Sequence, residues 1–429
     1  MKFTLYTNAL SAHQIPLARE IARHAGAENF QYVYTSRNGQ ALQESVASDS
    51  WICYAPSGGD LAARHDVADW LENADVILVG GIRPIDLIER RVKSGKKTFY
   101  MSERWFKPTL GILRLAWPPY FRMAKRFAKM LRSCNSLVYL PIGIHAARDM
   151  ARLCGLMHGD WRCLFRAPRL GFENCPMGRV WLRQSRRVAE ASSVNCRLSS
   201  VPDKHCLDKM RMWGYFVEPS KNAMRPVQEA RDAPASNLTN NDQRLITNTL
   251  KVLWVGRLLR LKRVDTIIKA VGYLTSQTSQ TYQASQTYQA SQTSQTSQTS
   301  QTLLLDIYGS GPEEERLKKM AAKYGDVIKF HPPVPIEEVR KLMRNHDVYV
   351  FASNGYEGWG AVVSEAMEEG MRVVGTYEAG ASATMLPETN LFRSGDWKML
   401  VKRLSADIQC VPIGDWSVKC AAEQLMKVI

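Results

Sequence analysis

The sequence predicts an α/β protein of two domains, each a parallel β-sheet covered by helices. Short apolar runs alternate with helical patterns in the first half of the chain, and the alternation resumes after residue 250. Such alternation is typical of parallel strands joined by helices. Residues 218–249, rich in Pro, Ala, Asn and Asp, separate the two halves and are expected to form a linker. With 429 residues, 45% of them hydrophobic, the chain can fill two cores.

We assign residues 1–217 to an N-terminal domain and residues 250–415 to a C-terminal domain. Residues 156–211 show no clear periodicity and are a candidate insertion in the first domain. Residues 275–302 are nearly pure Ser-Gln-Thr and cannot supply a core. They join a helix to a strand, so they are expected at the sheet edge opposite the ligand, remote from the chemistry. Residues 416–429 are expected to form a terminal helix.

The expected elements follow from apolar runs of strand length and from apolar residues at helical spacing. The strands are Phe3–Thr7, Phe30–Tyr34, Asp75–Val79, Thr98–Met101, Ser136–Leu140, Lys251–Val255, Leu303–Tyr308, Val327–His331, Asp347–Ser353 and Met371–Thr376. The helices are Ile15–Ala25, Leu61–Asn73, Pro84–Val92, Val264–Leu274, Glu313–Tyr324, Ile336–Asn345, Ala361–Glu369 and Asp415–Ile429.

The charge and cysteine content narrow the class of protein. A formal net charge of +16 indicates an anionic partner: nucleic acid, an acidic membrane surface or a phosphorylated substrate. No nucleic-acid-binding motif accompanies the charge, so nucleic acid is not expected. The nine cysteines are scattered without a CxxC, which favours reduced thiols in a cytoplasmic protein; no metal is expected. The chain has no run of 18 apolar residues, so no transmembrane helix is expected. The apolar stretch at its first residues is too short for a signal peptide.

Two glutamates flank the start of a helix at the end of an expected strand. Glu357 and Glu365 have seven residues between them, including Gly358 and Gly360. A helix N-terminus beside glycine N–H groups favours an anion. Eight helical steps would set the glutamates about 12 Å apart along the axis, which suits hydroxyl binding on both sides of a diphosphate. The alternative is an amphipathic helix with solvated acids.

The stretch ASNGYEGWGAVVSEAMEEGMRVVGT, residues 352–376, resembles the E-x7-E motif of the retaining glycosyltransferases of family 4, the group 1 glycosyltransferases. The resemblance implies the GT-B fold, in which two Rossmann-like domains have parallel sheets facing across a cleft. It implies that Glu357 contacts the transferred sugar and that Glu365 contacts the nucleotide ribose. Gly309 and Gly311 are similar to the GxGP that the family has near the donor.

A second motif supports the same resemblance. Gly256 and Arg257 follow an expected strand, and Lys262 stands five residues after the arginine. In the family, residues at this spacing bind the donor diphosphate. Two fixed cations would neutralise the charge that builds on a departing nucleoside diphosphate, so no metal ion or other cofactor is expected. Arg263 stands where the family has a glycine.

The acceptor side departs from the family pattern. The loop after the first strand lacks the usual glycines and the usual histidine. His13 and Glu103 are the candidates for contacts near the reacting centre, because both follow expected strands. Alternatively, His13 caps a helix or packs in its loop. Glu103 would alternatively form an ion pair.

The segment from residue 104 to 132 has eight Lys or Arg and no Asp or Glu, with six aromatic residues between them. In the helix expected around residues 120–132, basic residues recur every three or four positions beside an apolar arc. This pattern is typical of a helix on an anionic lipid surface. A sheet-covering helix with a basic outer face would have the same pattern.

Together these observations predict a retaining, metal-independent glycosyltransferase that uses a nucleotide sugar. The acceptor would be a glycan or a lipid-linked glycan precursor of a cell-envelope polysaccharide. The protein would be cytoplasmic, or peripheral on the inner face of the membrane. A sugar-nucleotide epimerase of the same fold and a non-catalytic sugar-nucleotide binder remain alternatives; a dinucleotide-dependent oxidoreductase is not favoured, because no GxGxxG follows a strand.

Overall fold

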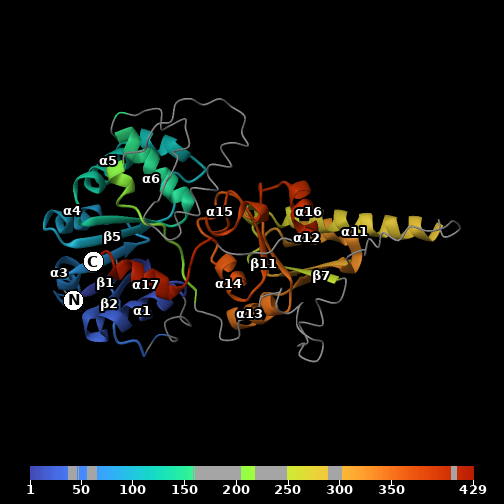
Figure 1. Cartoon of the computed structure of the whole chain (residues 1–429), viewed down its shortest axis with the longest axis horizontal. Helices are drawn as coiled ribbons and strands as arrows, with labels where there is room; N and C mark the ends of the chain where they lie inside the picture. The colour runs from blue at the N-terminus through green and yellow to red at the C-terminus, as the bar shows by residue number, and fades with distance from the viewer. Residues whose placement is uncertain are drawn as a thin grey trace. The chain divides into compact units, whose positions relative to one another are not determined.

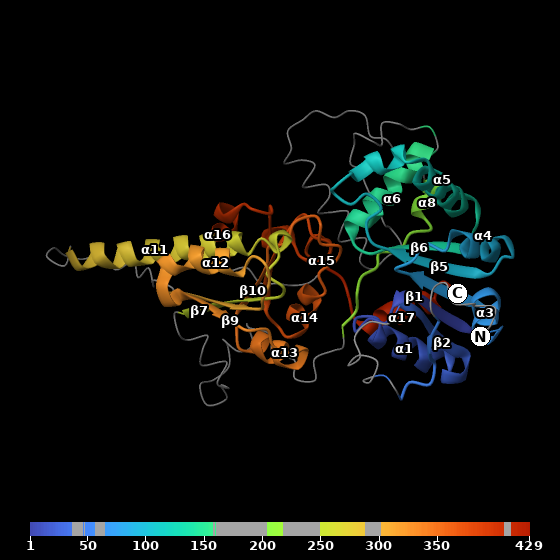
Figure 2. The ribbon, with the colours of Figure 1, turned by 180° about the vertical axis from the view of Figure 1, so that it is seen from behind.

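The computed structural model describes residues 1–36, 46, 48–55, 65–157, 159, 204–217, 249–287, 302–406 and 413–429. The chain forms two compact units (Figure 1). Unit 1 comprises residues 1–218 and 413–429, and unit 2 comprises residues 219–412. Each unit is a parallel six-stranded sheet with helices packed on it, as Figure 2 shows from the other side.

The sheet of unit 1 has the strand order β3-β2-β1-β4-β5-β6, and all its pairs are parallel. This is the doubly wound order, in which the chain reverses direction across the sheet between β1 and β4. The elements are β1 (Phe3–Ala9), α1 (Ile15–Ala25), η1 (Ala27–Asn29), β2 (Phe30–Ser36), β3 (Ile52–Tyr54), α3 (His65–Asn73), β4 (Val76–Gly80), α4 (Ile85–Lys93), β5 (Lys97–Ser102), η3 (Gly111–Ala116), α5 (Pro118–Ser133), β6 (Leu137–Pro141), α6 (Ile144–Met157), α8 (Lys204–Leu207) and α17 (Val418–Met426).

The sheet of unit 2 has the order β12-β11-β10-β7-β8-β9, again all parallel. Counted from β7, this is the same doubly wound order, with the reversal between β7 and β10. The elements are β7 (Thr249–Val255), η6 (Arg260–Lys262), α11 (Val264–Thr287), β8 (Thr302–Tyr308), α12 (Glu314–Ala321), η7 (Ala322–Val327), β9 (Ile328–His331), α13 (Ile336–Arg344), β10 (Val348–Phe351), α14 (Val362–Glu368), β11 (Arg372–Thr376), α15 (Gly380–Met385), η8 (Glu388–Asn390), β12 (Leu391–Phe392) and α16 (Trp397–Ser405).

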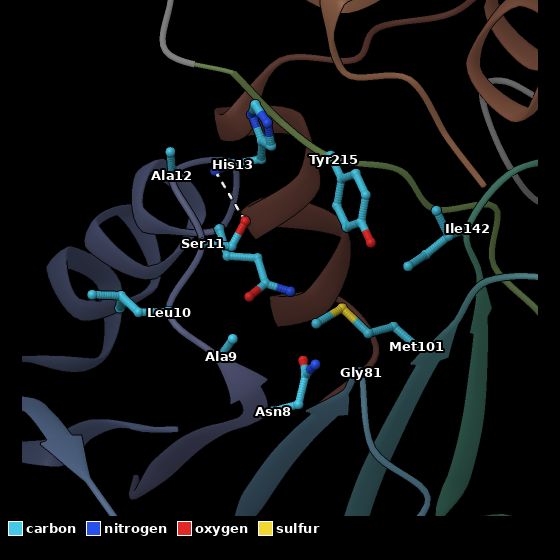
Figure 3. A pocket seen from close by; sticks show the side chains of 11 residues that line it. Asn8, Ala9, Leu10, Ser11, Ala12, His13, Gly81, Met101, Ile142 and Tyr215 are labelled. Atoms are coloured by element: carbon cyan, nitrogen blue, oxygen red, sulfur yellow. Dashed lines mark hydrogen bonds between the residues drawn. The ribbon is translucent and has the colours of Figure 1, made fainter. Parts of the chain in front are cut away.

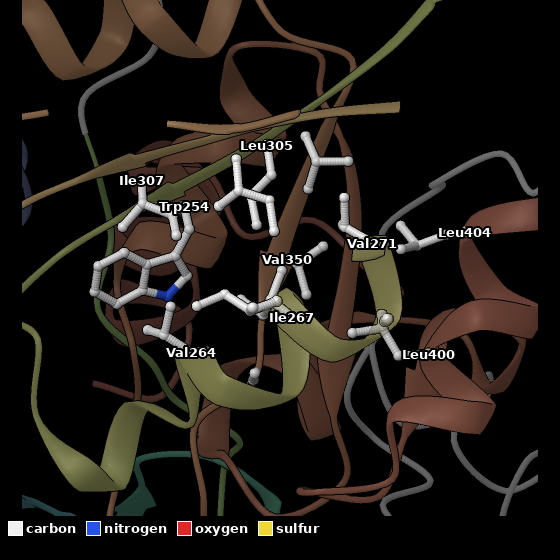
Figure 4. Packing of buried hydrophobic residues seen from close by; sticks show 14 of the residues in the cluster. Trp254, Val264, Ile267, Val271, Leu305, Ile307, Val350, Leu400 and Leu404 are labelled. Atoms are coloured by element: carbon white, nitrogen blue, oxygen red, sulfur yellow. The ribbon is translucent and has the colours of Figure 1, made fainter. Parts of the chain in front are cut away.

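The core of unit 2 lies between its sheet and the helices α11 and α16. Ile267 and Val271 of α11 pack against Leu305 and Val350 of the central strands, and all four are buried (Figure 4). Leu400 of α16 closes the same cluster. This continuous apolar packing fixes the strands whose carboxyl ends carry the site residues.

The C-terminal helix α17 belongs to unit 1. It is capped by Ser417, whose hydroxyl accepts a hydrogen bond from the Cys420 N–H at 3.2 Å. Its buried side chains, among them Ala421 and Leu425, face the fold, and the helix packs against α1. Just before it, the Trp416 ring stacks on Phe216 at a centroid distance of 6.5 Å. The chain therefore leaves unit 1, builds unit 2 and returns.

The Ser-Gln-Thr repeat is partly helical, which corrects the expectation of a helix that ends at Leu274. Helix α11 continues to Thr287, and residues 288–301 lie outside the described part of the chain. The repeat lacks Gly and Pro, so nothing in it stops a helix that has already nucleated. Strand β8 begins at Thr302 beside Thr249, the first residue of β7, so the repeat joins the sheet at the edge where strands begin.

Helix α5 covers the sheet with the apolar arc that had two interpretations. Ala124, Phe127, Ala128 and Leu131 are all buried within unit 1. The Phe127 ring packs on Tyr100 at 4.9 Å between centroids. This arc is therefore not available to lipid, and only its first member, Phe121, remains exposed. Among the described residues, no helix has the length and hydropathy needed to cross a bilayer.

Residues 209–213 lie along the outer edge of β6. The Tyr139 N–H donates to the Lys209 carbonyl at 2.8 Å, and the Trp213 N–H donates to the Pro141 carbonyl at 3.0 Å. At the C-terminal end of residues 156–211, the candidate insertion, the backbone therefore pairs with the sheet. Residues 160–203 of that range lie outside the described residues.

Candidate functional site

The candidate site of unit 2 lies at the point where its strand order reverses. Strands β7 and β10 are neighbours, and the loops after them leave the sheet in opposite directions. Ligands of doubly wound sheets bind at this position, outside the carboxyl ends of the strands. The loop after β7 carries Arg257 and Lys262, and the loop after β10 carries Glu357. The topology thus places the two predicted motifs on adjacent loops.

Backbone hydrogen bonds join these loops. The Asn354 N–H after β10 donates to the Leu261 carbonyl after β7 at 2.9 Å. The Asn354 side chain accepts from the Tyr356 N–H at 3.1 Å, and its carbonyl accepts from the Glu357 N–H at 3.0 Å. This tight turn presents the Glu357 side chain beside η6, whose last residue is Lys262. The Lys262 ammonium group donates to the Glu357 carboxylate and forms an ion pair with it.

The glycines of the loop after β8 are required by close backbone contact. The Gly256 N–H donates to the Tyr308 carbonyl at 3.0 Å, and the Leu258 N–H donates to the Ser310 carbonyl at 2.9 Å. A Cβ at Gly309, where φ is +145°, would lie 1.9 Å from the Gly256 carbonyl oxygen. The loops after β7 and β8 therefore pack backbone to backbone, which a side chain at Gly309 would prevent.

A second glycine contact positions the turn that follows Glu357. A Cβ at Gly360, where φ is +93°, would lie 2.2 Å from the Phe351 ring. A Cβ at Gly380, the first residue of α15, would lie 2.1 Å from the Gly358 carbonyl oxygen. The Ala381 N–H donates to the Trp359 carbonyl at 2.9 Å. The turn is thus held between β10 and α15.

The two predicted cations have different environments. Lys262 is half-buried, with 21% of its side chain exposed, and its charge is balanced by Glu357. Arg257 is exposed, and its guanidinium has no hydrogen bond or ion pair within the described part of the chain. A guanidinium with five free donors is well suited to phosphate oxygens.

Glu365 is buried in α14, with 6% of its surface exposed. Burial raises the pKa of its carboxyl, and the positive charge of Arg340 opposes this effect. Both Glu365 and Glu357 act electrostatically on the phenol of Tyr349, the buried residue of β10 whose hydroxyl donates to the Val255 carbonyl at 3.1 Å. Both glutamates therefore lie within electrostatic range of the Tyr349 phenol. Helix α14 begins only at Val362, so the two glutamates are not separated by the eight helical steps expected from the sequence.

Unit 1 has a pocket at its own point of strand reversal. A cavity of about 410 Å³ lies beyond β1 and β4, and it is lined by the loop Asn8–Gln14, by Gly81 and by Tyr215 (Figure 3). A Cβ at Gly81 would lie 2.0 Å from the Asn8 side-chain oxygen, so the glycine leaves room for that amide. Figure 3 shows His13 and Tyr215 on one side of this space and Asn8 opposite them.

His13 and Glu103 are linked through Tyr215, a residue that the sequence did not single out. The His13 ring stacks on the Tyr215 ring at a centroid distance of 6.1 Å. The Tyr215 hydroxyl donates to the Glu103 carboxylate at 3.3 Å, and Lys107 pairs with the same carboxylate at 3.2 Å. Burial lowers the pKa of His13 and raises that of Tyr215. Tyr215 follows residues 209–213, which run along β6 without a periodic pattern, so the sequence offered no signal for it.

Two doubly wound domains in one chain, with a site at the reversal point of the second, fit the GT-B fold. Residues 237–409 match the family model described as glycosyl transferases group 1, which places the match in unit 2. Over 144 residues the chain is 26% identical to an uncharacterized glycosyltransferase, MJ1069, of Methanocaldococcus jannaschii. That similarity covers 33% of this chain and 31% of the relative, so the chain spans about a third of that protein's length.

Solved structures support the fold over the whole chain. The Anabaena protein Alr3699/HepE, solved in complex with UDP, has a TM-score of 0.54 at 13% identity; the alignment covers 100% of this chain and 97% of that one. The lipopolysaccharide outer core galactosyltransferase WaaB has a TM-score of 0.51 at 13% identity, covering 94% of this chain and 89% of that one. At these identities the likeness shows the fold alone.

Proposed function

We propose that this protein is a retaining glycosyltransferase that moves a sugar from a nucleotide-sugar donor to an acceptor hydroxyl. The observation that carries the proposal is the ion pair between Lys262 and Glu357, which joins the two predicted motifs at the reversal point of unit 2. The family match over residues 237–409 covers both motifs. A neighbour of the same fold, Alr3699/HepE, was solved with UDP, which supports a nucleotide ligand.

The chemistry assigned to unit 2 is the departure of a nucleoside diphosphate. The acceptor oxygen forms a bond to the anomeric carbon on the face from which the diphosphate leaves. The bond from that carbon to the phosphate oxygen breaks, and the acceptor proton passes to the departing phosphate. Arg257 and Lys262 stabilise the negative charge that grows on the leaving group, while Glu357 orients the sugar. The step requires no protein nucleophile and no metal ion.

Glu365 is assigned to the ribose of the donor. A buried carboxylate gains most from a hydroxyl that donates to it, since the hydrogen bond replaces the water lost on burial. Gly256, Gly309, Gly311, Gly358 and Gly360 would let the donor approach the backbone of the surrounding loops.

The acceptor is assigned to the pocket of unit 1. Asn8, Ser11 and Tyr215 provide hydrogen-bonding groups around an otherwise partly apolar space, as a sugar ring requires. His13 and Glu103 support Tyr215 from two directions. We propose a glycan or lipid-linked glycan precursor of a cell-envelope polysaccharide as acceptor, and a cytoplasmic protein that works at the inner membrane face. The fold neighbour WaaB, a lipopolysaccharide galactosyltransferase, is consistent with this class of acceptor.

Product analysis separates this proposal from its alternatives. Purified protein is incubated with UDP-, GDP- and ADP-sugars labelled in the sugar, with and without a membrane-lipid extract. A transferase moves label to the acceptor and releases nucleoside diphosphate only when acceptor is present. An epimerase releases a rearranged sugar without acceptor, and a binding protein releases nothing. Either of the last two outcomes would overturn the proposal.

A further inference from the structure

The segment between β5 and α5 turns its large apolar side chains outward. Leu110, Leu113, Trp117 and Phe121 are 55%, 70%, 62% and 37% exposed. They are four of the nine exposed large hydrophobic residues among those described, and the other five are scattered along the chain. Scattered apolar side chains on a surface are ordinary, but four within twelve residues mark an interaction site. We call residues 107–129 the outer segment.

Buried anchors hold the outer segment just before its start and at its middle. Before it, the Phe106 N–H donates to the buried Asp149 carboxylate at 2.9 Å. At its middle, the Tyr120 hydroxyl donates to the Trp105 carbonyl at 2.7 Å. The Arg83 guanidinium lies over both rings, 4.9 Å from the centroid of Trp105 and 5.4 Å from that of Tyr120. The outward apolar residues therefore stand on a fixed base, with η3 packed against α5.

The charged residues within this stretch of the chain all have one sign. Residues 104–132 contain no acid. Arg126 is engaged by Asp86 and Glu89 of α4, the former at 2.7 Å. Four basic residues of the outer segment have no ion pair with any described residue: Arg114, Arg122, Lys125 and Lys129.

We propose that the outer segment binds the surface of an anionic lipid bilayer. Leu110, Leu113, Trp117 and Phe121 would enter the headgroup region, where a tryptophan ring is favoured. The four unpaired basic residues would bind the lipid phosphates. A protein partner of ordinary composition is a poorer match, because nothing on the outer segment would pair with its basic groups. The inserted residues lie before α5 and in its first turn; of the apolar arc that covers the sheet, they include only its exposed first member, Phe121.

Vesicle binding by the full chain tests the proposal without donor or acceptor, so its failure would leave the transfer reaction untouched. Neutral phosphatidylcholine vesicles are compared with vesicles containing about 30% phosphatidylglycerol, at low and high salt. We expect co-sedimentation with the anionic vesicles only, and release at high salt because the charges are screened. No binding to anionic vesicles at low salt would overturn the proposal.

Paired variants identify the surface. Arg122→Glu with Lys125→Glu should weaken binding by at least about tenfold. Lys319→Glu with Lys323→Glu, which removes the same charge from unit 2, should leave binding within about twofold. Leu113→Ser with Trp117→Ser should also weaken binding by about tenfold, while Ile336→Ser, at an apolar residue of unit 2 that is 53% exposed, should not. Equal losses in the unit 2 controls would mean that the protein binds the vesicles only through its overall net charge. That result would overturn the assignment.

Discussion

Lys262 and Glu357 are 95 residues apart in the sequence, and their side chains form an ion pair at the reversal point of the second sheet. The loops that carry them are also joined through the backbone of Leu261 and Asn354. In this arrangement the carboxylate balances the ammonium charge, so a donor phosphate must share or replace Glu357 as the partner of Lys262. In the roles proposed above, the pair would couple the sugar-orienting group to the group that receives the leaving diphosphate.

Removing either proposed phosphate-binding cation should reduce turnover far more than stability. We expect Arg257→Ala and Lys262→Ala each to lower kcat by about 10²–10³, since each removes one electrostatic stabiliser of the leaving group. Arg257→Ala should leave Tm unchanged because the side chain is exposed and unpaired. Steady-state rates and thermal melts measure both effects. Arg260→Ala, on the same loop and equally exposed, is the control and should keep its activity. Normal rates in both variants would contradict the assignment.

Glu365→Gln should stabilise the protein and weaken nucleotide binding. Because burial raises the pKa of Glu365, its stabilising contribution is complete below the unfolded-state pKa and is lost as pH rises through the folded-state pKa. The variant escapes this loss, so its Tm advantage should be larger at pH 8 than at pH 4.5. The shift in Tm that a saturating nucleotide sugar produces should shrink, because a ribose-binding group is gone. Glu368→Gln, on the same helix, is the control. A nucleotide shift that survives in Glu365→Gln would remove the residue from the site.

Asp306→Asn should destabilise unit 2 in a pH-dependent way. His346 at 3.1 Å and His331 at 2.6 Å donate to the two oxygens of the Asp306 carboxylate. These hydrogen bonds, that of His346 most of all, lower the pKa of Asp306. The stabilisation is therefore present above the unfolded pKa and is lost as pH falls through the folded one. We expect a cost of about 2 kcal/mol at pH 7 that shrinks as pH falls through the folded-state pKa, measured by urea unfolding. A pH-independent difference would contradict this cause.

Asp306→Asn should also affect the loop after β8, which contains Gly309 and is proposed to bind the donor. The Gly309 N–H donates to the carbonyl of His331 at 3.1 Å, and the His331 ring stacks on Tyr308 at 4.3 Å. We expect Asp306→Asn to raise KM for the donor more than it lowers kcat, because it loosens the loop and leaves the reacting groups in place. A change in kcat alone would argue against an effect of Asp306 through the loop after β8.

Arg263 offers a test of backbone strain next to Lys262. It has φ +50° and ψ +39°, the left-handed region, where the family has glycine. Its guanidinium is bound to Asp265 at 3.1 Å. Arg263→Ala keeps the strain and loses the ion pair, whereas Arg263→Gly loses both. We expect the glycine variant to be about 1 kcal/mol more stable than the alanine variant, which is about 2–4 °C in Tm for a domain of this size. Equal melting temperatures would mean that the strain costs nothing.

The sequence was most informative where chemistry requires particular residue types. Lys262 and Glu357 could be assigned to one site because both follow buried strands, and parallel strands end at a common edge. The same argument could not find Tyr215, since no periodic run marks residues 209–213 as a strand-like edge of the sheet. Strands β3 and β12, three and two residues long, were missed for a similar reason: they are too short to show an alternating pattern.

Amphipathic patterns predicted that a segment is helical, but they did not predict what the helix packs against. The apolar arc of α5 predicted a helix, but a helix that covers a sheet and one that lies on lipid need the same spacing. Only the buried positions of Phe127 and Leu131 distinguish them. In the repeat, polar composition argued against a core, yet it did not prevent α11 from continuing to Thr287, because helix propensity does not require burial.

The return of α17 to unit 1 has a consequence for how the protein is made. On the ribosome, the residues of β1 to β6 emerge first, but α1 lacks the helix that packs against it until all of unit 2 has been synthesised. Unit 2 has its whole core in one continuous stretch and can fold while translation continues. Unit 1 must wait for Ala421 and Leu425 to reach α1. The first domain to be translated is therefore the last to be completed.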